Sequence, residues 1–447
     1  MMVPRIVLAG AGSGVGKTTI ATGLMRRLSR GHRVQGFKVG PDFIDPMFHT
    51  AATGRPSRNL DSFMLEPDVM RNLFGWSTRD ADIAIVEGVR GLYDGLTAVG
   101  DTGSTAEIAK MLDAPVVLIV NARSLAKSAA AVVLGFRQLD PSVRIAGVIL
   151  NQIGGPRHLA KAAEAVESLA GVEVVGAIER QGEALPERHL GLIAPGEARK
   201  DTMDSLEALV EDVDVNRIME IASSAGDVDL PTSSPFVEQE PTGVRIAVPC
   251  DRAYRFYYPE NIEALSAAGA EVLRFRPSEG EDLPDCDGVY LGGGYPELYA
   301  SAIADNRNFL EGLRTLSEDG GAVYGECGGL MTMCSSLHVN GEEHRMAGIL
   351  PSMAVFTGKR HGPSYMRVTG TPDNFLLPNA AMRGHEFHYS EVRPMPGSSY
   401  GLRVERGLGI AGSMDGLMVR RSMGTYMHLH ALSCRQWAPA LVAAAGH

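Results

Sequence analysis

The first half of the chain alternates short apolar runs with longer amphipathic stretches. The runs are rich in β-branched residues and predict strands, whereas the stretches between them carry helical spacing. Near-continuous apolar strands that alternate with helices are typical of a parallel sheet covered on both faces. The predicted strands are RIVLAG (5–10), HRVQGFKV (32–39), DIAIVEG (82–88), PVVLIVNA (115–122), RIAGVILN (144–151) and EVVGAI (173–178).

A polar segment without periodicity interrupts this pattern at residues 224–243. Its sequence, SAGDVDLPTSSPFVEQEPTG, is rich in Pro, Ser, Asp and Glu, which favours a linker. A new series of β/α elements follows, with strands predicted at 244–250, 288–294 and 320–329. We therefore predict one α/β domain over residues 1–223 and a second over residues 244–447.

Composition narrows the class of partners. The 447 residues carry a formal net charge of −11, which argues against nucleic acid and anionic membranes as partners. The apolar runs, such as 114–120, are too short to span a bilayer, and the N-terminal run predicts a core strand. Five cysteines form no CxxC pair, and an odd number fits a reducing compartment, so we expect a cytoplasmic protein.

The first predicted strand leads into a glycine-rich loop. AGSGVGKT at 11–18 fits the phosphate-loop pattern, with Ala11 where glycine is common. Lys17 would reach the β- and γ-phosphates of a nucleotide, and Thr18 would ligate Mg²⁺. Asn151 ends another strand, where reading a purine edge and capping backbone both remain open. The predicted nucleotide-binding residues are Gly12, Gly14, Gly16, Lys17, Thr18, Thr19 and Asn151.

Four carboxylates follow predicted strands that neighbour this loop. Glu87 ends one strand, Asp94 lies in the loop after it, and Asp42 and Asp45 follow another strand. Ligands of parallel sheets bind at the carboxyl ends of the strands. We predict that Thr18, Asp42, Asp45 and Glu87 hold Mg²⁺ and that Asp45 and Asp94 orient a phosphoryl acceptor. A helix cap or a solvated loop acid is the alternative for each.

The second half contains a candidate nucleophile in VYGECGGL (323–330). Cys327 stands between a predicted strand and a predicted helix with glycines around it, as in a strained nucleophile elbow. A helix start is expected to lower the pKa of the thiol. YLGGGYPE at 290–297 ends another strand, so Gly293, Gly294 and Gly328 are predicted to form an oxyanion hole.

A cysteine nucleophile needs a base, and the sequence offers several histidines. GTYMHLH at 424–430 supplies His428 and His430, and RGHEFHYS at 383–390 supplies His385 and His388. Spacing alone does not choose among them. The other four cysteines lack glycine-rich surroundings and are interpreted as packing residues.

With these motifs the chain resembles the cobyrinate a,c-diamide synthases, glutamine-dependent amidotransferases of tetrapyrrole biosynthesis. The resemblance extends over nearly the whole length, and the stretch from 37 to 65 is its most specific part. The matching stretches are AGSGVGKTT, FKVGPDFIDPMFHTAATGRPSRNLDSFML, VEGVRGLYDG, LPERHLGL, FYYPEN, LGGGYPELYA, YGECGGLM and GHEFHYS.

The resemblance implies a fold and roles for individual residues. The first domain is similar to dethiobiotin synthetase, a P-loop NTPase-like parallel sheet, and the second to class I glutamine amidotransferases. Cys327 is then the glutaminase nucleophile and His428 its base. Class I enzymes carry a glutamate two residues after this histidine. Here that position is His430, so the resemblance assigns no third member of the triad.

The implied reaction amidates the a and c acetates of a macrocycle in two steps. ATP with Mg²⁺ would activate each carboxylate as an acyl phosphate, and glutamine would supply the ammonia. The implied substrate is cobyrinate or nickel-sirohydrochlorin, with hydrogenobyrinate as an alternative, and a homodimer is compatible with the resemblance. A partition-type ATPase, which has no use for Cys327 or His428, is the more distant alternative.

A polyanionic substrate on an acidic protein predicts a local basic patch. Tyr257 and Tyr258 could stack on the macrocycle, with core packing as the alternative. The candidates for the basic patch are Arg55, Arg58, Arg188, His189, Lys359, Arg360 and His361.

Overall fold

The computed structural model describes residues 3–180 and 200–446. The chain divides into two compact units, Met1–Pro235 and Phe236–His447, each described here by itself. The division falls inside the segment 224–243 that the sequence marks as a linker. Arg188 and His189 of the predicted basic patch lie outside the described residues.

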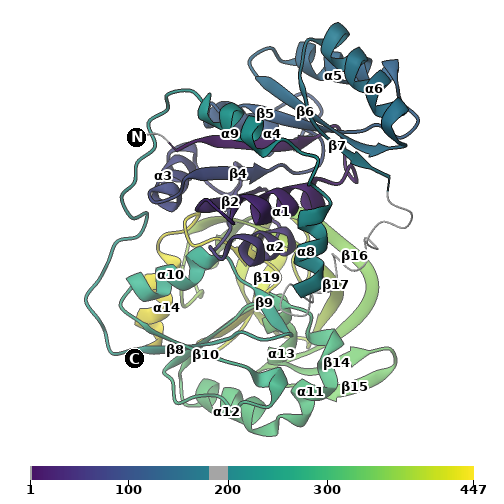
Figure 1. Ribbon diagram of the computed structural model, residues 1–447. Coiled ribbons are helices and arrows are strands. Elements are labelled where there is room, and N and C mark those ends of the chain that lie inside the picture. Colours follow the sequence, from purple (N-terminus) through teal and green to yellow (C-terminus); the bar gives the residue numbers. More distant parts are fainter. Residues whose placement is uncertain (1–2, 181–199, 447) are drawn as a thin grey trace. The chain divides into compact units, whose positions relative to one another are not determined.

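A parallel sheet forms the centre of the first unit (Figure 1). Its strand order within the described residues is β3-β2-β4-β1-β5-β6-β7, and every neighbouring pair is parallel. The six predicted strands are all present, and the short β3 is an addition. The strands are β1 (Arg5–Gly10), β2 (Val34–Val39), β3 (Arg58–Leu60), β4 (Ile83–Glu87), β5 (Val116–Asn121), β6 (Ile145–Ile153) and β7 (Val174–Glu179).

Helices cover both faces of this sheet because its strands are apolar on both faces. Ile6 of β1 belongs to the same buried cluster as Leu24 of α1. On the opposite face, Phe37 of β2 stacks on Phe74 of α3 with ring centroids 4.6 Å apart. The helices are α1 (Lys17–Leu28), α2 (Ile44–Thr53), α3 (Pro67–Thr78), α4 (Thr105–Met111), α5 (Lys127–Leu139), α6 (Pro156–Ala165), the π-helical turn η1 (Val166–Ala170), α8 (Lys200–Ala208) and α9 (Val215–Ser223).

The second unit is built on a mixed sheet. The order β10-β8-β11-β13-β20 is parallel, and it continues through β19, β18 and β16 to β14 and β15, mostly antiparallel. The strands are β8 (Arg245–Pro249), β10 (Glu271–Phe275), β11 (Gly288–Leu291), β13 (Ala322–Glu326), β14 (Cys334–Val339), β15 (Glu342–Arg345), β16 (Leu350–Gly370), β17 (Ala381–Pro394), β18 (Ser399–Arg406), β19 (Met414–Val419), β20 (Ser422–Thr425) and β21 (His428–Leu429), with β9 (Tyr254–Phe256) and β12 (Gly293–Gly294) forming a separate pair.

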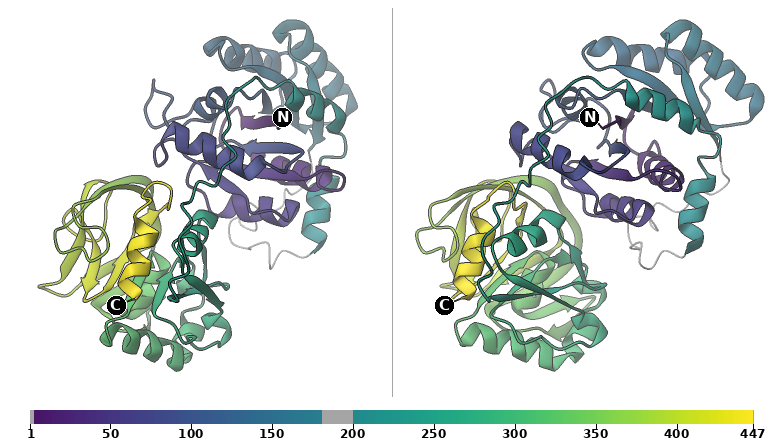
Figure 2. Two further views of the ribbon diagram at one scale, coloured as in Figure 1. Left: turned by 90° about the vertical axis from the view of Figure 1, so that its left-hand side faces the viewer. Right: turned by 60° about the vertical axis from the view of Figure 1, so that its left-hand side comes forward.

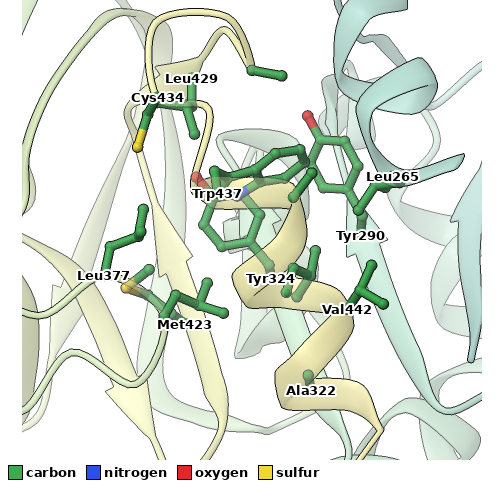
Figure 3. Packing of buried hydrophobic residues seen from close by; sticks show 14 of the residues in the cluster. Leu265, Tyr290, Ala322, Tyr324, Leu377, Met423, Leu429, Cys434, Trp437 and Val442 are labelled. Carbon is green, nitrogen blue, oxygen red and sulfur yellow. The ribbon is translucent and has the colours of Figure 1, made fainter. Parts of the chain in front are cut away.

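A buried cluster of aromatic residues packs against the parallel strands β11 and β13. Trp437 of the C-terminal helix packs edge-on against Tyr290 of β11 and Tyr324 of β13, with ring centroids 5.1 and 5.6 Å away (Figure 3). This helix, α14, is yellow in Figure 2. The helices are α10 (Pro259–Ala267), α11 (Ala300–Asp305), α12 (Arg307–Glu318), α13 (Gly328–Met333) and α14 (Trp437–Ala445), with 3-10 turns η2 (Pro277–Glu279) and η3 (Pro296–Leu298).

Candidate active sites

The glycine-rich loop joins β1 to α1, as the sequence predicts. Gly14 and Gly16 adopt φ values of 72° and 92°, which L-residues with side chains rarely adopt. A Cβ at Gly16 would lie 2.5 Å from the side-chain nitrogen of Asn151. That nitrogen donates to the carbonyl of Val15 at 2.9 Å. Asn151 therefore contacts the backbone of the loop, as the second of its two predicted roles requires.

Lys17 is buried at the start of α1. Its Nζ donates to the carbonyls of Gly12 at 3.0 Å and Arg90 at 2.6 Å, which places the amine over the loop. Burial, and next the charge of Lys38, lowers the pKa of Lys17. Phosphate oxygens would replace carbonyl oxygens as acceptors and compensate this unfavourable environment.

Glu87, at the end of β4, is the centre of the polar cluster below the loop. Its Oε1 accepts from Thr18 Oγ1 at 2.7 Å and from Lys38 Nζ at 2.8 Å, and its Oε2 lies 2.6 Å from His49 Nε2. Burial alone would raise the pKa of Glu87, but the charge of Lys38 and the hydrogen bond from His49 hold it below its ordinary value.

Sequence reasoning missed two members of this cluster. Lys38 lies inside β2 and His49 inside α2, and both side chains are buried. A lysine in a buried strand was the available signal, because a buried ammonium requires an acidic partner. Lys38 has two such partners, Glu87 and Asp45, with Nζ–O distances of 2.8 and 2.6 Å.

Asp45 and Asp42 differ in function within the fold. Burial, followed by the charges of Asp42 and Glu87, raises the pKa of Asp45 to about 8. Asp42 accepts the backbone N–H groups of Ile44 and Asp45 at 2.7 and 3.0 Å, which is the helix-cap alternative. Asp42 therefore fixes the start of α2 and the position of Asp45.

Asp94 lies in the loop that follows β4. Its Oδ2 accepts the backbone N–H of Gly91 at 3.0 Å, so the carboxylate stabilises its own loop. A Cβ at Gly91 would lie 3.5 Å from Gly12 Cα, which places this loop beside the glycine-rich loop. Thr19, also predicted to bind nucleotide, lies in the first turn of α1.

Oxygen donors for a hard cation gather here. Mg²⁺ is usually held by one or two carboxylates together with substrate phosphates, and no preformed cage is needed. The described residues contain no group of three or more His, Cys, Asp or Glu arranged for a metal. The Thr18 hydroxyl and the Glu87 carboxylate, 2.7 Å apart, fit Mg²⁺.

Two residues of the predicted basic patch, Arg55 and Arg58, contact other side chains of the first unit. Arg55 pairs with Asp80 at 2.6 Å, and Arg58 lies over the ring of Trp76 at 4.7 Å. Both side chains therefore have partners within the first unit. In the second unit, Arg360 lies over the ring of Phe387 at 5.1 Å.

Cys327 occupies a tight turn between β13 and α13. Its φ of 47° is positive, as expected of a strained nucleophile elbow. Small neighbours are required, because a Cβ at Gly329 would lie 2.3 Å from the carbonyl oxygen of Leu291, and one at Gly325 2.5 Å from Met333 Sδ. The Cys327 N–H donates to the carbonyl of Thr425 at 2.8 Å, which ties the elbow to β20.

The three glycines predicted for the oxyanion hole lie together. A Cβ at Gly328 would lie 3.1 Å from the backbone nitrogen of Gly294. A Cβ at Gly293 would lie 2.5 Å from His428 Cε1. The glycine-rich strand end therefore lies close to both the elbow and the imidazole of His428, and only backbone fits there.

His428 lies on β21 and contacts an acid that the sequence analysis did not assign. Its Nδ1 is 3.3 Å from Oε2 of Glu326, which is buried and directly precedes the nucleophile. Glu326 Oε1 also accepts the backbone N–H of Leu429 at 3.3 Å. The Glu326 carboxylate therefore faces the Nδ1 side of this imidazole, where a carboxylate can orient a histidine ring.

The residue at the usual glutamate position faces elsewhere. His430 Nε2 lies 3.5 Å from Glu260 Oε2, and both side chains are fully buried. The ring of Tyr258 packs on His430 with centroids 4.7 Å apart. Tyr257 donates its hydroxyl to the Pro249 carbonyl at 2.7 Å. Tyr258 is therefore buried in the core, which is the packing alternative, whereas Tyr257 is partly buried against that core.

The alternative bases are less suited to the task. His388 Nδ1 lies 2.8 Å from the carbonyl of Ser390, and its ring stacks on Tyr426. Burial lowers the pKa of His388 to about 4. His385 stacks on His428 with centroids 5.0 Å apart, and burial lowers its pKa as well. Neither ring therefore gains a proton easily at neutral pH.

The expectation of a lowered thiol pKa is wrong for this state of the protein. Burial raises the pKa of Cys327, and the charge of Glu297 raises it further. Cys327 is only 5% exposed. Desolvation of the thiolate therefore outweighs the effect of the helix start.

Asp415 anchors the segment that carries His428. It is fully buried and accepts from Thr425 Oγ1 at 2.7 Å and from the backbone N–H groups of Tyr426 and Met427 at 3.1 and 3.2 Å. Sequence reasoning missed it, although an aspartate inside the apolar strand β19 was a visible signal.

Comparison with known proteins joins these sites to a family. Residues 6–192 match the CobQ/CobB/MinD/ParA nucleotide binding domain, and residues 245–436 match the CobB/CobQ-like glutamine amidotransferase domain. A cobyrinate a,c-diamide synthase of Methanothermobacter thermautotrophicus is 47% identical over 442 residues, covering 97% of this chain and 98% of that protein. The chain belongs to the cobyrinate a,c-diamide synthase family.

Another family member, from Archaeoglobus fulgidus, is 42% identical over 438 residues, covering 97% of this chain and 95% of its own. A crystal structure of a glutamine amidotransferase is 17% identical, covers 45% of this chain and 99% of that chain, and has a TM-score of 0.35. As a member of this family, the chain is a glutamine-dependent amide-forming ligase with the predicted α/β fold, and it uses ATP. Within the described residues, no helix combines the length and apolarity needed to cross a membrane.

Proposed function

We propose that this synthase amidates the a and c acetate carboxylates of a tetrapyrrole macrocycle, with ATP and glutamine as co-substrates. The observation that carries the proposal is the presence in one chain of two built sites, the Cys327 elbow and the Lys17 loop. Relatives named cobyrinate a,c-diamide synthase match along almost the full chain. Cobyrinate and nickel-sirohydrochlorin are the proposed macrocycles, and hydrogenobyrinate is the alternative.

At the nucleotide site a carboxylate of the macrocycle attacks the γ-phosphoryl group of ATP, which forms an acyl phosphate and releases ADP. Ammonia then attacks the acyl carbon and displaces inorganic phosphate, which leaves the amide. Lys17 would donate to the transferring phosphoryl oxygens, and the loop N–H groups would hold the β-phosphate. Thr18 and Glu87 would hold Mg²⁺, which when bound supplies positive charge to the phosphates. Asp45 and Asp94 would orient the carboxylate acceptor.

At the glutaminase site the thiol of Cys327 gives its proton to His428 Nε2 while sulfur attacks the side-chain amide carbon of glutamine. The oxyanion hole of Gly293, Gly294 and Gly328 would stabilise the tetrahedral intermediate. Its collapse releases ammonia and leaves a thioester, which water hydrolyses to glutamate. Glu326 would orient the imidazole, the task of the missing triad glutamate.

A partition-type ATPase is the second candidate only for the first domain, whose matched family also includes proteins of that type. The glutamine amidotransferase domain of the same chain disfavours it, because such an ATPase needs no amide nitrogen.

Product analysis tests the proposed function. The protein is incubated with ATP, Mg²⁺ and glutamine, and with cobyrinate or nickel-sirohydrochlorin, and the products are measured by mass spectrometry. Conversion of two carboxylates to amides in one of these macrocycles is expected. If neither macrocycle gains an amide, the proposal is wrong.

The division of labour is tested by Cys327→Ser. This variant should lose the glutamine-dependent reaction and keep the reaction with high ammonium, because acyl-phosphate formation does not use the thiol. Loss of both reactions, with normal folding by circular dichroism, would contradict the separation of the two chemistries.

A further inference from the structure

One carboxyl of the second unit has a buried oxygen atom without a hydrogen-bond partner among the described residues. Glu297 lies in the 3-10 turn η3, which follows the oxyanion strand β12. Its Oε2 is buried and makes no hydrogen bond to any described residue. The hydrogen bond that the carboxyl does accept comes from its own backbone N–H. Burial therefore raises the pKa of Glu297 to about 7.

The turn that carries this carboxyl adjoins the nucleophile. The residue before it, Pro296, has its Cδ 3.1 Å from the place where a Cβ at Gly328 would lie, and Gly328 directly follows Cys327. After burial, the charge of Glu297 is the largest influence that raises the pKa of the Cys327 thiol.

The neighbouring acidic side chains, Glu326 and Asp415, already accept hydrogen bonds or contact a histidine. Glu326 contacts His428 and the backbone of Leu429, and Asp415 accepts four hydrogen bonds from the segment before His428 and from Gly416. Among the described residues, the Oε2 atom of Glu297 has no hydrogen-bond partner. A buried acid without a cation is unfavourable for folding, so its presence beside a nucleophile indicates a ligand that brings the cation.

Glutamine is a ligand that carries such a cation. Its zwitterion carries an α-ammonium group a few bonds from the side-chain amide that the thiol attacks. We propose that Glu297 is the subsite for the α-ammonium group of glutamine and selects glutamine over amides that lack this group. The proposal rests on the glutaminase activity proposed above and specifies how its substrate is recognised.

Occupation of this subsite would also change the nucleophile. The ammonium neutralises the charge that Glu297 places near the thiol, which lowers the pKa of Cys327 when glutamine binds. The free enzyme then holds its thiol protonated, and the thiolate forms with the substrate in place.

A pair of substrates tests the subsite. Glutaminase kcat/KM is measured for L-glutamine and for glutaramate, which is glutamine without its α-amino group, in wild type and in Glu297→Gln. We expect the preference for glutamine to fall by about 10- to 100-fold in the variant, the size of a lost hydrogen bond to a charged group. Glu279→Gln, an exposed glutamate of the 3-10 turn η2, is the matched control and should keep the wild-type preference.

Two further readouts separate recognition from misfolding. Ammonium-dependent amidation by Glu297→Gln should equal that of wild type, and iodoacetamide should alkylate Cys327 faster in the variant without glutamine. An unchanged preference for glutamine, with wild-type glutaminase activity intact, overturns the subsite alone. A wild-type protein that does not hydrolyse glutamine overturns both the subsite and the proposed function.

Discussion

Glu326→Gln tests the arrangement of the glutaminase base. The substitution keeps the shape of the side chain and removes its charge, while the amide oxygen can still accept one hydrogen bond. His428 gains a proton in the step that forms the thiolate, so the variant loses the carboxylate that faces this imidazolium 3.3 Å away.

The expected loss of activity can be estimated from the distance between His428 and Glu326. Two unit charges 3.3 Å apart interact by about 5 kcal/mol at an effective dielectric constant of about 20, which is the largest effect to expect. A hydrogen bond to a charged group typically contributes about 1.5–3 kcal/mol. We therefore expect a loss of about 2 kcal/mol of transition-state stabilisation, or roughly 30-fold in glutaminase kcat.

The assay compares two nitrogen sources. Glutamine-dependent amidation should fall with glutaminase kcat, and ammonium-dependent amidation should stay at the wild-type rate because it does not use His428. Glu342→Gln, an exposed strand glutamate, is the control for the substitution itself. Full glutaminase activity in Glu326→Gln would refute the positioning role, and equal loss of both activities would indicate a folding defect.

Three further substitutions test other parts of the structure. Lys17→Met should abolish amidation from either nitrogen source, measured by product formation, while thiol chemistry remains intact by alkylation of the nucleophile. The folded protein holds the Asp45 proton up to about pH 8, well above the ordinary pKa of 3.8, because of burial and neighbouring carboxylates. This group therefore makes stability fall as pH rises between those values, and thermal unfolding of Asp45→Asn should show a smaller fall. Gly329→Ala should destabilise the second unit, because its Cβ would lie 2.3 Å from the Leu291 carbonyl oxygen, whereas Gly135→Ala, in open space, should not.

The first unit could be predicted almost entirely from the sequence. Strands buried on both faces have continuous apolar runs, and β1 to β7 follow such runs apart from the short β3. The phosphate loop is equally visible, since its glycines, lysine and threonine are contiguous. In the second unit, the sequence predicted β8, β11 and β13 but not the parallel strands β10 and β20. The long strands β16 to β19 were missed because they mix exposed polar positions with bends and register shifts.

The polar cluster around Glu87 shows which contacts cannot be predicted from local sequence patterns. Asp45 and Glu87 can be predicted because they lie at or after the carboxyl ends of strands, where parallel sheets bind ligands. Lys38 is visible as a residue, but its position between both acids depends on β2 pairing with β4 in register, with Lys38 opposite Glu87. Sequence spacing contains no information on that register, so the buried cation was missed.

The glutaminase site shows the same limit with a functional consequence. The family pattern places the third triad member two residues after His428, and His430 there is turned toward Glu260. The acid that contacts His428 instead lies 102 positions away in the chain, next to the nucleophile itself. The sheet brings them together, because β13 pairs with β20 up to Glu326 and Thr425, and His428 follows three residues later. Since the elbow fixes the backbone of Glu326 as firmly as that of Cys327, one turn can position both the nucleophile and the group that orients its base.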